Sequence, residues 1–136
     1  MDSIKYRAGY KYQLHEDFEI QVSIKPEKEE KDDYIILDTD GKLTIKKGYA
    51  WDGPSGPTID TANFMRGALV HDALYQLMRE NHIDRSHREE ADHELWRIIR
   101  KDGMSRPRAW WVYRAVRLAA GDFADPAAIK EIRVAP

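Results

Sequence analysis

The chain has 136 residues, which is enough for one hydrophobic core and predicts a single domain over residues 1–136. Hydrophobic residues make up 42% and charged residues 34%, a balance typical of globular rather than disordered chains. A formal net charge of -2 gives no overall attraction to polyanions, so a nucleic-acid partner is not expected. The absence of cysteine excludes disulfides and thiol chemistry. No apolar run is typical of a signal peptide or a membrane span, so we expect synthesis in the cytoplasm.

The first part of the chain, residues 1–50, predicts a small antiparallel sheet, because aromatic and β-branched residues alternate there with polar ones. The charged segment 26–33, PEKEEKDD, predicts a solvated loop. Asp40-Gly41 predicts the turn of a hairpin, since glycine accepts a positive φ at little steric cost. The segment 51–60 begins WDGPSGP and predicts a shaped loop, because its prolines and glycines suit neither a strand nor a helix interior.

The second part, residues 61–121, predicts three helices. The first runs from near Thr61 to about Glu80, the second from about Ser86 to Gly103, and the third from Arg106 to Ala120. The tail, residues 122–136, has too little pattern to assign. The expected fold class is therefore α+β, with an N-terminal antiparallel sheet followed by a three-helix unit.

His71 and Asp72 interrupt an apolar run in the first predicted helix, and burial of such groups is costly unless each has a partner. Tyr75 lies four residues after His71 and so shares its face. The short connection to the second helix predicts antiparallel packing, which would bring Asp92 to the His71 ring. A carboxylate bonded to one imidazole nitrogen fixes the tautomer and leaves the other nitrogen to act as a general base. In the alternative interpretation HDALY is structural, and Asp92 caps or solvates its own helix.

A hard cation is the second chemical expectation. Asp72 is rotated by about a hundred degrees from His71, so its carboxylate is available to bind such an ion through oxygen. The glycine-rich loop could add backbone carbonyls, because glycine allows unusual backbone angles. The ion would then polarise an ester carbonyl. Asp52 in this loop either binds the ion directly or hydrogen-bonds its own backbone as a turn residue.

Together, HDALY, Asp92 within EADHELW and the upstream WDGPSG resemble the secreted phospholipase A(2) superfamily over roughly residues 48–120. They are especially similar to the disulfide-free phospholipase domain of parvovirus capsids. The resemblance implies calcium-dependent ester hydrolysis, with His71 activating water, Asp92 orienting His71 and Tyr75 bonding the supporting carboxylate. The calcium ligands it implies are the Asp72 carboxylate and backbone carbonyls, while Asp52 is an additional carboxylate in the loop that could also bind the ion. Those carbonyls belong to Trp51, Gly53 and Ser55.

The whole chain also resembles the phage and prophage domain-of-unknown-function family 1353, through the W-D-G-P-S loop, the H-D-x-L-Y helix and the A-D helix. That resemblance implies a protein made in the host cytoplasm, which either acts there or is incorporated in the phage particle. The leading hypothesis is a phage-encoded hydrolase acting on phospholipid or another envelope ester. One alternative is a non-catalytic virion or assembly protein that binds other phage proteins. Another is cleavage of an amide by the same site.

Two other groups of residues are candidates for a functional role. His82, His87 and His93 lie close together, but their spacing matches no known ligand pattern, which favours exposed polar residues over a transition-metal site. The third predicted helix combines tryptophans with arginines, which favours a core helix with arginines at its edge. The alternative is a surface for an anionic partner, with peripheral membrane contact through residues 106–120. The residues of that surface are Trp110, Trp111, Arg106, Arg108, Arg114 and Arg117.

Overall fold

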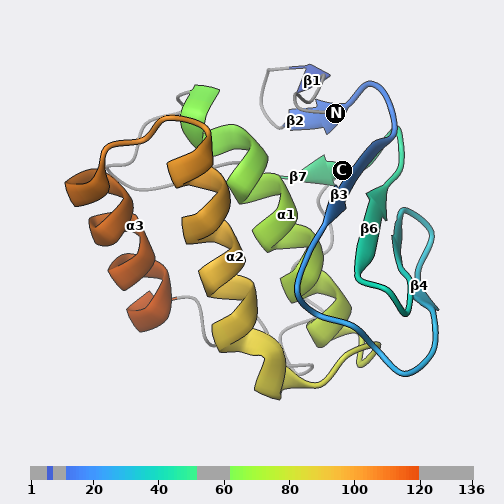
Figure 1. The fold of residues 1–136 in the computed structure, drawn as a ribbon. Helices are drawn as coiled ribbons and strands as arrows, with labels where there is room; N and C mark the ends of the chain where they lie inside the picture. Colours follow the sequence, from blue (N-terminus) through green and yellow to red (C-terminus); the bar gives the residue numbers. More distant parts are fainter. Residues whose placement is uncertain (1–5, 8–11, 52–61, 120–136) are drawn as a thin grey trace.

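The computed structural model describes residues 6–7, 12–51 and 62–119 and has an α+β fold, as expected from the sequence. Two small antiparallel sheets precede three packed helices (Figure 1). Several predicted features lie outside the described residues, namely the tail and most of the glycine-rich loop with Asp52, Gly53, Ser55 and Thr61. Within the described residues, no helix has both the length and the apolar character needed to span a membrane.

The N-terminal part forms two sheets, so the expectation of a single sheet was wrong. The three-stranded sheet has the order β1-β2-β7 and the four-stranded sheet has the order β3-β6-β5-β4, with every pairing antiparallel. The chain bends between β2 and β3, so β2 pairs with β1 and with the distant β7 and not with β3, the strand that follows it. The strands are β1 (Tyr6–Arg7), β2 (Tyr12–Leu14), β3 (Phe18–Gln21), β4 (Glu30–Lys31), β5 (Ile35–Leu37), β6 (Lys42–Ile45) and β7 (Ala50–Trp51).

Two boundaries in this part also differ from the sequence-based expectation. The charged segment 26–33 is not wholly a loop, because Glu30–Lys31 pairs with β5. A charged edge strand of this kind discourages pairing with other chains. Trp51 belongs to β7 and not to the following loop, since it pairs with Tyr12 of β2. The predicted hairpin turn is confirmed, with Gly41 at a φ of 87° between β5 and β6.

The three predicted helices are confirmed as α1 (Ala62–Arg79), α2 (Arg88–Lys101) and α3 (Arg106–Ala119). A single 3-10 turn, η1 (Arg85–His87), leads into α2. The helix α2 lies between α1 and α3, and the sheets lie on the other side of α1 (Figure 1). The helix α1 is therefore buried on two sides, which explains why its apolar residues extend around most of its circumference.

Close contact between α1 and α2 depends on Gly67. A Cβ atom at this position would lie 2.7 Å from Ile99 Cγ2 and 2.9 Å from Leu95 Cδ1, so a larger side chain would push the helices apart. Near the same end, Arg66 donates two hydrogen bonds to the Asp102 carboxylate, at 3.0 and 2.8 Å. These contacts fix how the two helices cross, and hence which side chains face each other farther along.

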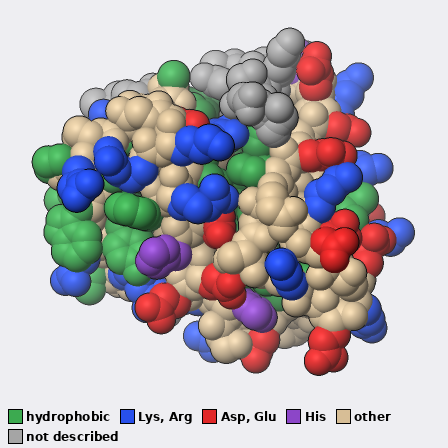
Figure 2. Space-filling view, in the orientation of Figure 1, with side chains coloured by type: hydrophobic (Ala, Val, Ile, Leu, Met, Phe, Trp, Pro, Cys, Tyr) green, Lys and Arg blue, Asp and Glu red, His purple; other side chains and the backbone are tan. Residues whose placement is uncertain are grey.

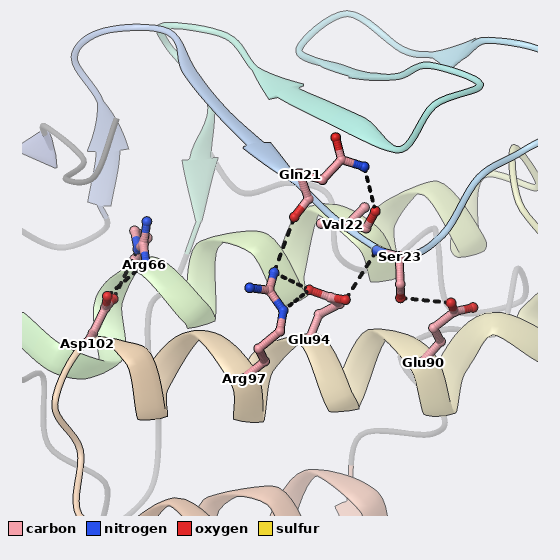
Figure 3. Close-up of polar contacts among 8 residues, drawn as sticks. All are labelled: Gln21, Val22, Ser23, Arg66, Glu90, Glu94, Arg97 and Asp102. Atoms are coloured by element: carbon pink, nitrogen blue, oxygen red, sulfur yellow. Dashed lines mark hydrogen bonds and ion pairs between the residues drawn. The ribbon is translucent and has the colours of Figure 1, made fainter.

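Polar contacts hold α2 against the segment that follows β3 (Figure 3). The backbone N–H of Ser23 donates to Glu94 at 3.2 Å, and the Ser23 hydroxyl donates to Glu90 at 2.8 Å. Arg97 Nε donates to Glu94 at 2.9 Å, while Arg97 Nη2 donates to the Gln21 carbonyl at 3.2 Å. The helix α2 is thus fixed to the sheet region by this segment as well as by its packing on α1.

Candidate active site

The buried carboxylate of Asp92 joins all three helices. Its Oδ1 atom lies 2.7 Å from His71 Nε2 and accepts a 2.6 Å hydrogen bond from the Tyr75 hydroxyl, both from α1. Its Oδ2 atom accepts a 2.8 Å hydrogen bond from Arg117 Nη1 of α3. Asp92 is 0% exposed, so the alternative in which it caps or solvates its own helix is wrong. The prediction that the side chains of His71, Tyr75 and Asp92 lie together is therefore confirmed.

The partners of Asp92 determine which nitrogen of His71 is basic. An ionised carboxylate can only accept hydrogen bonds, so Nε2 of His71 carries a proton and donates it to Asp92. In the neutral ring Nδ1 then holds the lone pair. Nδ1 forms no hydrogen bond with any of the described residues. The His71 side chain is buried, with 8% of its surface exposed, so its ring is held firmly in place.

Two arginines complete this cluster, and the sequence-based interpretation assigned neither of them to it. Arg117 is the cation that bonds Asp92 directly. Arg88 Nε lies 3.9 Å from Asp92 Oδ2 and donates to the Tyr75 hydroxyl at 3.3 Å, while its Nη2 donates to the carbonyl of Arg117. Arg88 is four residues before Asp92 on the same helix, a spacing that could have indicated the pair. Nothing local in the sequence indicated Arg117, which comes from a different helix.

The pKa values in the cluster are consistent with an ionised Asp92. Burial alone would raise its pKa, but the hydrogen bonds from His71, Tyr75 and Arg117 hold the pKa below the usual aspartate value. Burial and then the Asp92 carboxylate raise the pKa of the Tyr75 hydroxyl, which therefore stays protonated and donates. The hydrogen bond to Asp92 raises the pKa of Arg117. At neutral pH the cluster thus contains one carboxylate anion that fixes the orientation of one imidazole.

Asp72, the predicted calcium ligand, lies on a different side of α1 from this cluster. Its charge acts on Tyr49, whose pKa is raised first by burial and then by the Asp72 carboxylate. The Tyr49 ring stacks on Trp51 with the ring centroids 6.3 Å apart. Asp72 and the end of β7 are therefore neighbours of the same tyrosine. The other predicted ligands, Asp52, Gly53 and Ser55, lie outside the described residues.

The remaining histidines do not gather into a metal site. His82 lies 3.4 Å from Glu30, and His87 lies 3.2 Å from Glu90. His93 is exposed and packs edge-on against Tyr113, with the ring centroids 5.7 Å apart. Within the described residues, no three acidic or histidine side chains are grouped so as to hold a metal ion.

The third helix differs from the favoured interpretation as a core helix. Trp110 and Trp111 are exposed, while Ala109 and Val112 are buried. Arg117 does not extend to a surface for anionic partners, because its guanidinium is bonded to Asp92. The tryptophans are therefore not core residues, and their exposure needs another explanation.

Comparison with known proteins identifies the chain by family alone. A search of curated proteins finds no match, and a search of solved structures finds none either. A family model does match, over residues 30–116, which include β4 to β7, all of α1 and α2, and most of α3. The matched region contains His71, Tyr75, Arg88 and Asp92. The chain belongs to the family described as "Protein of unknown function (DUF1353)".

Proposed function

We propose that this protein is a calcium-dependent ester hydrolase of the phospholipase A(2) type, in which His71 activates water. The observation that most supports the proposal is the 2.7 Å hydrogen bond between His71 Nε2 and the buried Asp92 carboxylate. A carboxylate that is ionised at neutral pH orients the imidazole and stabilises its protonated form during turnover, which is the arrangement a general base requires.

In the proposed reaction, Nδ1 of His71 takes a proton from water while the water oxygen bonds to the ester carbonyl carbon. The tetrahedral intermediate then loses the alcohol oxygen, which takes the proton back from the imidazolium, leaving a carboxylic acid and an alcohol. Asp92 keeps Nε2 protonated throughout. Tyr75 and Arg117 act as positioning residues, because they touch Asp92 and not the ester.

In this proposal calcium is held by the Asp72 carboxylate and by the carbonyls of Trp51, Gly53 and Ser55, with Asp52 as a further candidate. Asp72 and Trp51 are both close to Tyr49, which supports their taking part in one site. When bound, calcium would polarise the ester carbonyl. Calorimetry should detect calcium binding by the wild type and none by Asp72→Asn. Absence of binding to the wild type at millimolar calcium would contradict this part of the proposal.

The proposed substrate is a phospholipid or another envelope ester, and the proposed setting is a phage infection, in the host cytoplasm or from the particle. Fatty-acid release from phospholipid vesicles should require calcium and should fall by at least about a hundredfold in His71→Asn, which removes the general base. His82→Asn is the matched control, because His82 lies outside the cluster, and it should keep full activity. If the wild type releases nothing over a range of lipids and calcium concentrations, the proposal is wrong.

A second candidate function is a non-catalytic virion or assembly protein, which is favoured by one specific observation. Asp92 and Arg88 of α2 are bonded to Tyr75 of α1 and to Arg117 of α3, so the cluster also serves to join the three helices. This function predicts a stable stoichiometric phage partner and no turnover. Mass spectrometry of purified particles should then detect the protein, whereas its absence from particles would count against this candidate.

A further inference from the structure

The outer face of α3 carries large hydrophobic side chains in contact with solvent. Trp110 is 55% exposed, Trp111 is 49% exposed and Leu118 is 78% exposed. Among the described residues, Tyr34 in the sheet region is the one other large hydrophobic residue with comparable exposure. Three such residues on one helix form a patch of a kind that usually marks contact with a partner or a membrane.

Helical geometry places these residues on one stripe. Trp110, Arg114 and Leu118 follow one another at intervals of four residues, and Trp111 lies beside them. Ala109 and Val112 lie on the opposite side of the helix and are buried in the cluster that includes Leu95 and Ile99 of α2. The stripe of Trp110, Trp111, Arg114 and Leu118, here called the α3 outer face, therefore points away from the protein.

The charged residues of α3 are all positive. No aspartate or glutamate occurs in α3, whereas Arg106, Arg108 and Arg114 are present and none of them forms an ion pair with any residue that the structure describes. The Arg114 guanidinium lies 5.5 Å from the centroid of the Trp110 ring, in a cation–π contact. Figure 2 shows hydrophobic side chains beside Lys and Arg side chains over α3, at the left of the view.

We propose that the α3 outer face docks on an anionic phospholipid surface. Tryptophan favours the boundary between lipid headgroups and acyl chains, and arginine is attracted to anionic headgroups. A helix with a tryptophan-rich face flanked by cations is therefore suited to lie in the membrane interface. The overall net charge of -2 does not oppose this, because binding depends on the charges close to the lipid.

This docking would bring the candidate active site close to the membrane. Arg117 follows Arg114 by three residues on α3, and its guanidinium donates to Asp92, which holds His71. The helix that meets the lipid is thus bonded directly to the carboxylate of the site. The inference extends the proposed function by identifying how the hydrolase would reach a membrane substrate. Vesicle binding is measured without turnover, however, so the two proposals can fail separately.

The test is sedimentation of the full chain with vesicles of phosphatidylcholine alone or mixed with phosphatidylglycerol. The wild type should bind the mixed vesicles more tightly, and added salt should weaken that binding. Arg106→Gln/Arg114→Gln should weaken it on the order of 25-fold, since each arginine near an anionic surface contributes roughly fivefold. Trp111→Ser/Leu118→Ser should weaken it by at least about tenfold while the chain stays folded, because neither side chain is buried.

The matched control is Lys46→Gln/Lys47→Gln, which removes two exposed charges from the sheet region. It should bind mixed vesicles within about twofold of the wild type. An equal loss in this control, or no binding by the wild type, would overturn the proposal. So would a dimer detected by sedimentation velocity that Trp111→Ser dissociates, because the face would then be a contact between copies. Intact vesicle binding by an inactive His71→Asn supports docking whatever the outcome for hydrolysis.

Discussion

Two polar clusters on opposite sides of α1 show how neighbouring charges decide the state of a carboxyl group. In the cluster that joins the helices, Asp92 is bonded by His71, Tyr75 and Arg117, and its pKa is lowered. In the other cluster Glu80, at the end of α1, meets Asp32 from the turn between β4 and β5. Burial and then the hydrogen bond shared with Asp32 raise the pKa of Glu80 to about 7.

The difference lies in the charge balance of the partners. Asp92 faces two arginines and has no acidic partner among its bonded neighbours, so its charged form is favoured. Glu80 shares the amide of Gln76 with Asp32, at 3.1 and 3.0 Å, and two carboxylates so close favour protonation of one of them. A carboxylate that orients a general base must be ionised, and so it needs cationic neighbours like those of Asp92. This agrees with placing the candidate site around Asp92.

The largest expected effect comes from Asp92→Asn. This change leaves Arg117 and Arg88 without their buried anion, so the free energy of unfolding should fall by about 3 kcal/mol, as is typical when one partner of a buried ion pair is removed. Urea unfolding at neutral pH measures the change. Asp84→Asn is the control, because Asp84 is exposed and asparagine caps equally well, and it should change stability by less than about 0.5 kcal/mol.

The same variant tests the pH dependence of the wild type. Because the pKa of folded Asp92 is lowered, its contribution to stability is fully present above the unfolded pKa and is lost as the pH falls through the folded value. Unfolding measured from neutral to acidic pH should therefore show a loss of stability that is smaller in Asp92→Asn. Parallel curves for the two proteins would mean that Asp92 is not held in its charged form.

A smaller effect is expected for Tyr75→Phe. The hydroxyl donates to Asp92 and accepts from Arg88, so its removal should reduce the free energy of unfolding by about 1 kcal/mol. The acid loss of stability should also begin at higher pH, because Asp92 loses one donor that lowers its pKa. Tyr34→Phe alters an exposed tyrosine and should leave both quantities unchanged. An identical acid transition in Tyr75→Phe would contradict this role.

The smallest effect, and one of opposite sign, is expected for Glu80→Gln. The raised pKa means that the charged form is disfavoured in the folded state, so wild-type stability should fall as the pH rises from the unfolded value toward about 7. Glutamine removes this penalty and should make the protein slightly more stable at pH values above about 7, while leaving stability at acidic pH little changed. Glu89→Gln, at an exposed site, is the control. Destabilisation by Glu80→Gln at alkaline pH would refute the charge-balance explanation.

Local sequence signals were sufficient for the helices and for part of the site. The periodicity of apolar residues located α1, α2 and α3, and Asp40-Gly41 located the hairpin turn, because each depends on residues close together in the chain. The meeting of His71 with Asp92 was also predictable, since a short connection between two helices leaves antiparallel packing as the simple arrangement.

Only the tertiary structure decided the features that depend on distant partners. The strand β2 pairs with β7 across more than thirty residues, which separates the strands into two sheets. Arg117 reaches Asp92 because α3 packs on α2, and the same packing turns Trp110 and Trp111 outward. The amino-acid sequence of α3 favoured a core helix, but it does not itself determine which face of the helix is buried. The buried face is the one that packs on the apolar surface of α2, and the position of α2 depends on the packing of the whole chain.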